Sequence, residues 1–87
     1  ILPNHRLSLQ YHEKKEETIY VLEGELLVWT SADENTVYRV QKGTAYHVNP
    51  KQIHRFGAPS GNQPTRLLEV STPELDDVVR LADDYKR

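Results

Sequence analysis

The chain has 87 residues and no cysteine, and its 11 Lys and Arg against 13 Asp and Glu give a formal net charge of -2. A chain of this size buries only roughly 60% of its unfolded surface, so we expect one small domain over residues 1–87. This charge favours neither nucleic acid nor an anionic membrane as a partner, and disulfides and thiolate metal sites are excluded.

No apolar run approaches the roughly 20 residues that span a bilayer, and no signal peptide is visible at Ile1. We therefore expect a cytoplasmic protein with no membrane partner. The chain also lacks methionine, so Ile1 is not expected to be the natural start.

Short strands separated by turn residues predict an all-β fold of the sandwich or barrel type. The predicted strands cover residues 7–12, 18–22, 25–30, 36–40, 44–48, 52–56 and 65–71. The turn at Glu23-Gly24 predicts a hairpin between the second and third of these. Residues 73–87 are acidic and amphipathic, and they fit either a short helix or a strand.

The strand at 7–12 and the start of the next one carry a group of possible metal ligands. Side chains alternate along a strand, so Gln10 and His12 project from the same face. Glu17 follows five residues later, and the three side chains converge if the two strands pair. An amide oxygen, an imidazole and a carboxylate together suit a divalent metal.

This pattern resembles the first motif of the cupin family, in which the two ligands are followed by Glu and then by Gly, here Gly24. The stretch from Gly43 to His54 resembles the second cupin motif, with Asn49-Pro50 in its turn and Lys51 where the family usually has Gly. The resemblance implies a small jelly-roll β-barrel. It also implies one divalent ion held by Gln10, His12, Glu17 and His54. Zn, Mn, Fe and Ni all fit these ligands.

The context Leu-Ser-Leu-Gln-x-His resembles the cupin subgroup of phosphomannose isomerase type. Residues 68–71 and 76–87 also resemble the C-terminal end of the bifunctional mannose-6-phosphate isomerase/mannose-1-phosphate guanylyltransferases. The resemblance implies a domain like the metal-dependent isomerases, which acts on or binds a sugar phosphate or a nucleotide-sugar precursor, with Arg80 and Arg87 taking part in activity. Members of this subgroup carry earlier strand residues, so part of the barrel is implied to be missing here or supplied by a partner.

Other interpretations stay open at this point. Arg80 and Arg87 can equally be surface cations paired with nearby aspartates, and His5 and His47 lie outside both motifs. A cupin that binds a metal and a small ligand without turnover, such as a sensor, fits the same motifs. A metal-dependent dioxygenase is a third possibility, although Gln10 argues against it because such enzymes prefer more histidine ligands. Whether the chain is an enzyme is therefore left open.

The strand at 25–30 has apolar residues on both faces, since Leu26 and Val28 lie opposite Leu27 and Trp29. Burying both faces needs a second sheet or a second subunit. We therefore predict a homodimer formed through sheet faces or edges.

Overall fold

The computed structural model describes residues 1–74 and 77–84, and within them the chain forms eight strands and no helix. The predicted all-β fold is thus confirmed. The strands are β1 (Leu9–Tyr11), β2 (Glu17–Glu23), β3 (Glu25–Trp29), β4 (Tyr38–Gln41), β5 (Ala45–Val48), β6 (Arg55–Gly57), β7 (Arg66–Ser71) and β8 (Val79–Ala82). No helix in the described residues is long and apolar enough to cross a membrane.

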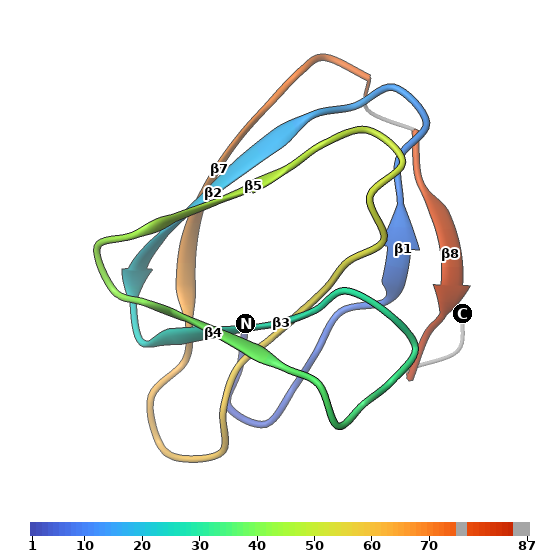
Figure 1. Ribbon diagram of the computed structural model, residues 1–87. Helices are drawn as coiled ribbons and strands as arrows, with labels where there is room; N and C mark the ends of the chain where they lie inside the picture. The colour runs from blue at the N-terminus through green and yellow to red at the C-terminus, as the bar shows by residue number, and fades with distance from the viewer. Residues whose placement is uncertain (75–76, 85–87) are drawn as a thin grey trace.

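The strands form two walls that face each other, as Figure 1 shows. One wall is the antiparallel sheet β5-β2-β7, and the other is β4-β3-β6. The β1-β8 pair continues the second wall, because isolated bridges join Arg6 to Gly57 and Gln10 to His54. The result is the small jelly roll that the sequence predicts.

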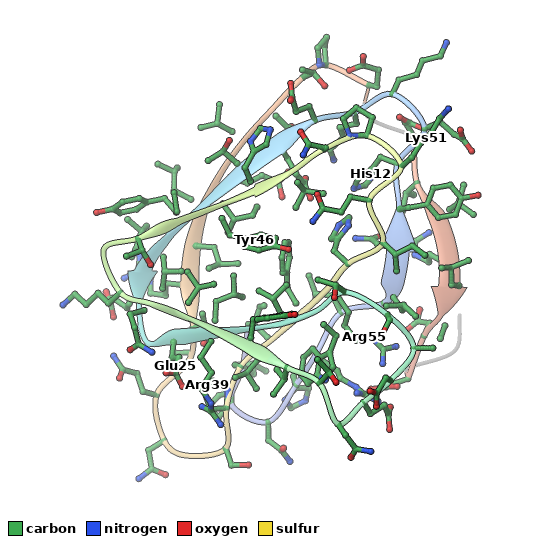
Figure 2. The ribbon with its side chains drawn as sticks, in the orientation of Figure 1. His12, Glu25, Arg39, Tyr46, Lys51 and Arg55 are labelled. Carbon is green, nitrogen blue, oxygen red and sulfur yellow. The ribbon has the colours of Figure 1, made fainter. Side chains whose placement is uncertain are left out.

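The core lies between the walls and is made of the inward residues of each strand. Ile19 and Val21 of β2 and Leu26 and Val28 of β3 are almost completely buried. Burying each such side chain contributes about 1.5–3 kcal/mol relative to its exposure to water. Tyr46 reaches into the interior from β5 (Figure 2), where its ring meets that of Phe56 edge to face.

The predicted hairpin at Gly24 is wrong, because β2 and β3 lie in different sheets. Only Gly24 separates the two strands, whereas the commonest hairpins need two loop residues. The chain instead crosses from one wall to the other at this glycine, so the apolar faces of the two strands can cover one another. Gly24 has a φ of +77°, and a Cβ there would lie 2.9 Å from the carbonyl oxygen of Pro64. Both features favour glycine at this crossing.

The end of the chain was expected to form either a short helix or a strand, and the structure shows a strand. Residues 79–82 form a strand rather than a helix, and this strand, β8, pairs with β1. The pairing of residues 7–12 with residues 18–22, given above as the condition for convergence of the ligands, does not occur, because β1 and β2 lie in different sheets. β1 pairs with β8 instead, with a register shift between Leu9 and Gln10.

Candidate metal centre

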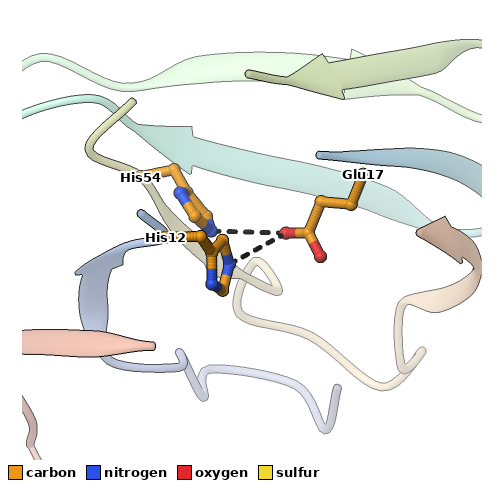
Figure 3. Close-up of side chains that lie close together, drawn as sticks. All are labelled: His12, Glu17 and His54. Atoms are coloured by element: carbon orange, nitrogen blue, oxygen red, sulfur yellow. Dashed lines mark ion pairs between the residues drawn. The ribbon is translucent and has the colours of Figure 1, made fainter. Parts of the chain in front are cut away.

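Three of the predicted ligands meet in the interior although they come from different strands. His12 directly follows β1, Glu17 begins β2, and His54 directly precedes β6. The Nε2 atoms of His12 and His54 lie 3.6 and 3.4 Å from the same oxygen of Glu17, Oε1 (Figure 3). Their side chains are 4%, 0% and 3% exposed for His12, His54 and Glu17, so the cluster is shielded from water.

Backbone carbonyls fix the orientation of both imidazole rings. Nδ1 of His12 is hydrogen-bonded to the carbonyl oxygen of Asp77, and Nδ1 of His54 to that of Gln52 at 3.0 Å. A carbonyl can only accept a hydrogen bond, so each Nδ1 carries the proton and each neutral ring keeps a lone pair on Nε2. Both Nε2 atoms are buried and have no hydrogen-bond partner among the residues that the structure describes.

This donor set fits a divalent cation. Two nitrogen lone pairs and a carboxylate oxygen face one another, which is unfavourable unless a positive charge lies between them. The three ligand atoms all lie within 4.8 Å of one another, and ligands about 2.1 Å from a tetrahedral ion are about 3.4 Å apart. Two imidazoles and one carboxylate also leave coordination positions for water or a substrate.

The carboxylate of Glu17 is kept ionised by its surroundings. Burial raises the pKa of Glu17. The contacts with His54 and the positive charge of Lys15 together lower this pKa by more than burial raises it, so the pKa of Glu17 is below its ordinary value. Nζ of Lys15 lies 3.6 Å from the second oxygen of Glu17 and 3.9 Å from Glu69. Burial, followed by the negative charge of Glu17, raises the pKa of Glu69.

Lys15 and Glu69 are functional candidates that the sequence interpretation missed. Lys15 belongs to the charged bend at 13–16, and its side chain is only 15% exposed. Its spacing of two residues from Glu17 is the one signal in the sequence that could have indicated this contact. Glu69 reaches the site only through the pairing of β7 with β2, which no local pattern predicts.

The turn at 49–52 explains the glycine that cupins usually have at the position of Lys51. Lys51 has a φ of +66°, a left-handed conformation in which glycine is favoured. Its amide donates a hydrogen bond to the carbonyl oxygen of His12, and the two residues lie side by side in Figure 2. The turn therefore holds the backbone of one candidate ligand in place.

Gln10 lies next to the cluster, and its role as a ligand stays a prediction. Its backbone exchanges two hydrogen bonds with His54, of 2.9 and 2.8 Å. Its side-chain oxygen accepts a hydrogen bond of 3.4 Å from the hydroxyl of Ser8.

Arg80 lies directly opposite Gln10 in the β1-β8 pair, so the two side chains are on the same face. Both line a cleft of about 930 Å³ between the N-terminal residues and β8. Arg80 therefore lies near the site, and its role in activity stays a prediction. Arg87 lies outside the described residues.

The two histidines outside the motifs lie away from the candidate metal ligands. The His47 ring is on the surface between Thr18 and Glu16, at 2.8 and 2.9 Å from their side-chain oxygens. The exposed His5 ring contacts the carbonyl oxygen of Pro3 at 2.8 Å.

A jelly roll with a buried cluster of two histidines and a glutamate defines a class of β-barrel domains that are suited to hold a metal. The cupin domain family matches residues 1–71, and the chain belongs to this family. Cupin domains commonly bind metals and small molecules.

One similar solved structure is that of an uncharacterized conserved protein with a double-stranded beta-helix domain from Klebsiella pneumoniae subsp. pneumoniae MGH 78578. The TM-score is 0.79 at 19% identity, over 95% of this chain and 66% of that one. This likeness supports the fold alone, and the chain spans about two thirds of that protein's length. No curated protein matches the chain.

Proposed function

We propose that this cupin domain binds one divalent metal through His12, Glu17 and His54, with Gln10 as the fourth ligand, and acts on a sugar phosphate. The observation that carries the metal site is the pair of buried, unpartnered Nε2 atoms directed at one carboxylate oxygen. A bound metal would act as a Lewis acid that polarises a carbonyl or hydroxyl of the sugar.

The residues around the site supply the other groups that an aldose–ketose isomerisation needs. Such a reaction requires a base that moves a proton between neighbouring carbons, and Glu69 and Lys15 are the ionisable groups beside Glu17. The phosphate requires a cation. Arg80 is exposed in the wall of the cleft, and its side chain lies beside that of Gln10. The motif resemblance to phosphomannose isomerases supports the sugar phosphate as the ligand.

Metal analysis of the purified protein, followed by an isomerisation assay with mannose 6-phosphate, tests this proposal. We expect about one divalent ion per chain, conversion of mannose 6-phosphate, and loss of conversion in an Arg80→Ala variant that keeps its metal. Binding of mannose 6-phosphate without conversion would favour the alternative of a cupin that binds a metal and a small ligand without turnover, such as a sensor. A protein that holds metal but ignores mannose 6-phosphate would contradict the sugar-phosphate part alone.

We also propose that the chain forms a homodimer through the outer face of β5-β2-β7. Tyr20, Leu22, Leu68 and Val70 are 39–66% exposed, and Tyr20 is paired with Leu68 across β2 and β7. A second copy of the same face would cover this apolar patch by two-fold symmetry. The other strand face considered in the sequence, that of Leu27 and Trp29, is already half-buried within the chain.

Replacing Leu68 by lysine should convert the dimer to a monomer, because it places a charge in the centre of the apolar patch. Analytical ultracentrifugation over a range of concentrations measures the change. Leu2→Lys is the matched control, since Leu2 is 64% exposed but lies outside the patch. A wild-type protein that stays monomeric at the highest concentration would contradict the proposed dimer.

A further inference from the structure

Asp77 makes four hydrogen bonds with the segment 12–15, which begins with the candidate ligand His12. Its carbonyl oxygen accepts the hydrogen bond from Nδ1 of His12. Its carboxylate accepts hydrogen bonds from the backbone amides of three consecutive residues, Glu13, Lys14 and Lys15, at 3.0, 2.6 and 2.8 Å. One residue therefore contacts both the ring of a candidate ligand and the bend that follows it.

These contacts come from a part of the chain that the family match does not include. The cupin match ends at residue 71, and Asp77 lies just before β8. The far end of the same segment is held separately, because Arg55 donates a hydrogen bond of 3.1 Å to the carbonyl oxygen of Ala82 and Arg6 pairs with Asp84. Besides the pairing of β8 with β1, side chains thus anchor the segment 77–84 at both ends, and one of these anchors lies at the candidate ligand His12.

The two kinds of contact at Asp77 depend on each other. The carbonyl sets which nitrogen of His12 carries the proton, and so leaves Nε2 free to face Glu17. Hydrogen bonds from backbone amides to an ionised carboxylate are among the stronger ones. They hold the carbonyl in place and also position the bend from which Lys15 reaches Glu17.

We propose that Asp77 is a positioning residue of the metal centre: its carboxylate docks the segment 77–84, and its carbonyl then orients His12 for ligation. By thermodynamic reciprocity, a bound metal must strengthen the docking of this segment by the same factor as docking strengthens metal binding. The metal half of this proposal rests on the proposed function, whereas the orientation of His12 holds in the metal-free protein as well.

The test compares Asp77→Ala with Asp33→Ala. Asp33 is a matched control, because its carboxylate also accepts local hydrogen bonds, from the Asn35 amide at 3.0 Å and the Thr36 hydroxyl at 2.8 Å, in a loop away from the cluster. Zn²⁺ affinity is measured by competition with a chromophoric chelator. We expect Asp77→Ala to bind Zn²⁺ about 10–100-fold more weakly than wild type, as removal of partners of metal ligands typically does, and Asp33→Ala to be unchanged.

Long-range ¹H–¹⁵N NMR of the imidazoles gives the second readout, which a general loss of stability would not change. We expect a protonated Nδ1 on His12 in the metal-free wild type and a mixture of tautomers in Asp77→Ala, with His54 unchanged as an internal reference. If Asp77→Ala does not fold, the same two measurements are made on Asp77→Asn, which has nearly the same size as aspartate but keeps only one acceptor oxygen and no charge. The same weakening of Zn²⁺ binding and the same change of the His12 tautomer are then expected, to a smaller extent.

Two results would overturn the proposal: a wild-type tautomer of His12 in the folded variant, or an unchanged Zn²⁺ affinity in a protein whose wild type binds Zn²⁺. A wild type that takes up no metal would refute the proposed function. A tautomer change in Asp77→Ala would still support the positioning of His12 in that case, so the two failures are distinguishable.

Discussion

Replacing His54 by alanine should lower the affinity for divalent metal by more than about 100-fold, beyond the 10–100-fold typical of partners outside the ligand shell. His54 is completely buried and supplies one of the three ligand atoms that cluster within residues 1–74 and 77–84. Without it, a bound ion would keep only one imidazole ligand, that of His12, beside the oxygen ligands of Glu17 and Gln10. The measurement is metal content after dialysis, together with competition against a chelator.

His47→Ala is the control for this experiment. The His47 ring is hydrogen-bonded to the side chains of Thr18 and Glu16 on the outer face. Removal of this ring should therefore leave the metal content at the wild-type level. Because alanine at position 54 leaves a cavity in the interior, Glu17→Gln provides a second variant of nearly equal volume that removes the carboxylate charge. A folded His54→Ala protein with full metal stoichiometry would contradict the assignment of the site.

The spacing of the motif residues predicted the cluster correctly, although the strand pairing that was considered as the way to bring them together does not occur. His12, Glu17 and His54 come together as the motifs imply, but β1 and β2 do not pair. The residues converge across the space between the two walls. A local pattern indicates which face of a strand a side chain occupies, whereas the neighbouring strand depends on the topology of the whole chain.

The hairpin and the tail show the same limit. Glu23-Gly24 is a normal turn signal, and only the single-residue length of the link, which depends on the exact strand ends, separates a hairpin from a crossing between sheets. The strand at 79–82 exists because β1 offers an edge to pair with. Its own sequence fits a helix equally well.

The contacts around the cluster could be predicted least. The bond from His12 to Asp77 joins residues 65 positions apart and uses a backbone carbonyl, which every residue type carries. The approach of Glu69 to Lys15 likewise depends on sheet register. Sequence patterns identify the residues that can ligate a metal, but not the backbone groups that orient them.

Metal affinity should fall steeply as the pH drops from about 7.5 to about 5.5. Two imidazoles must be unprotonated to ligate, and imidazole ordinarily takes up a proton near pH 6.5. Each imidazole that a proton must leave before it can ligate contributes up to about tenfold per pH unit to the loss of affinity, so two imidazoles contribute up to about 100-fold per pH unit. Glu17 does not contribute to this loss, because its lowered pKa keeps the carboxylate ionised across the range.

Competition titrations at three pH values, with the same metal and a chelator of known pH dependence, measure this slope. Glu17→Gln should bind metal more weakly at every pH but keep the slope, because both imidazoles remain. His47→Ala should reproduce the wild-type curve. An affinity that stays constant between pH 7.5 and 5.5 would show that the imidazoles of His12 and His54 do not ligate the metal, whatever the protein's metal content.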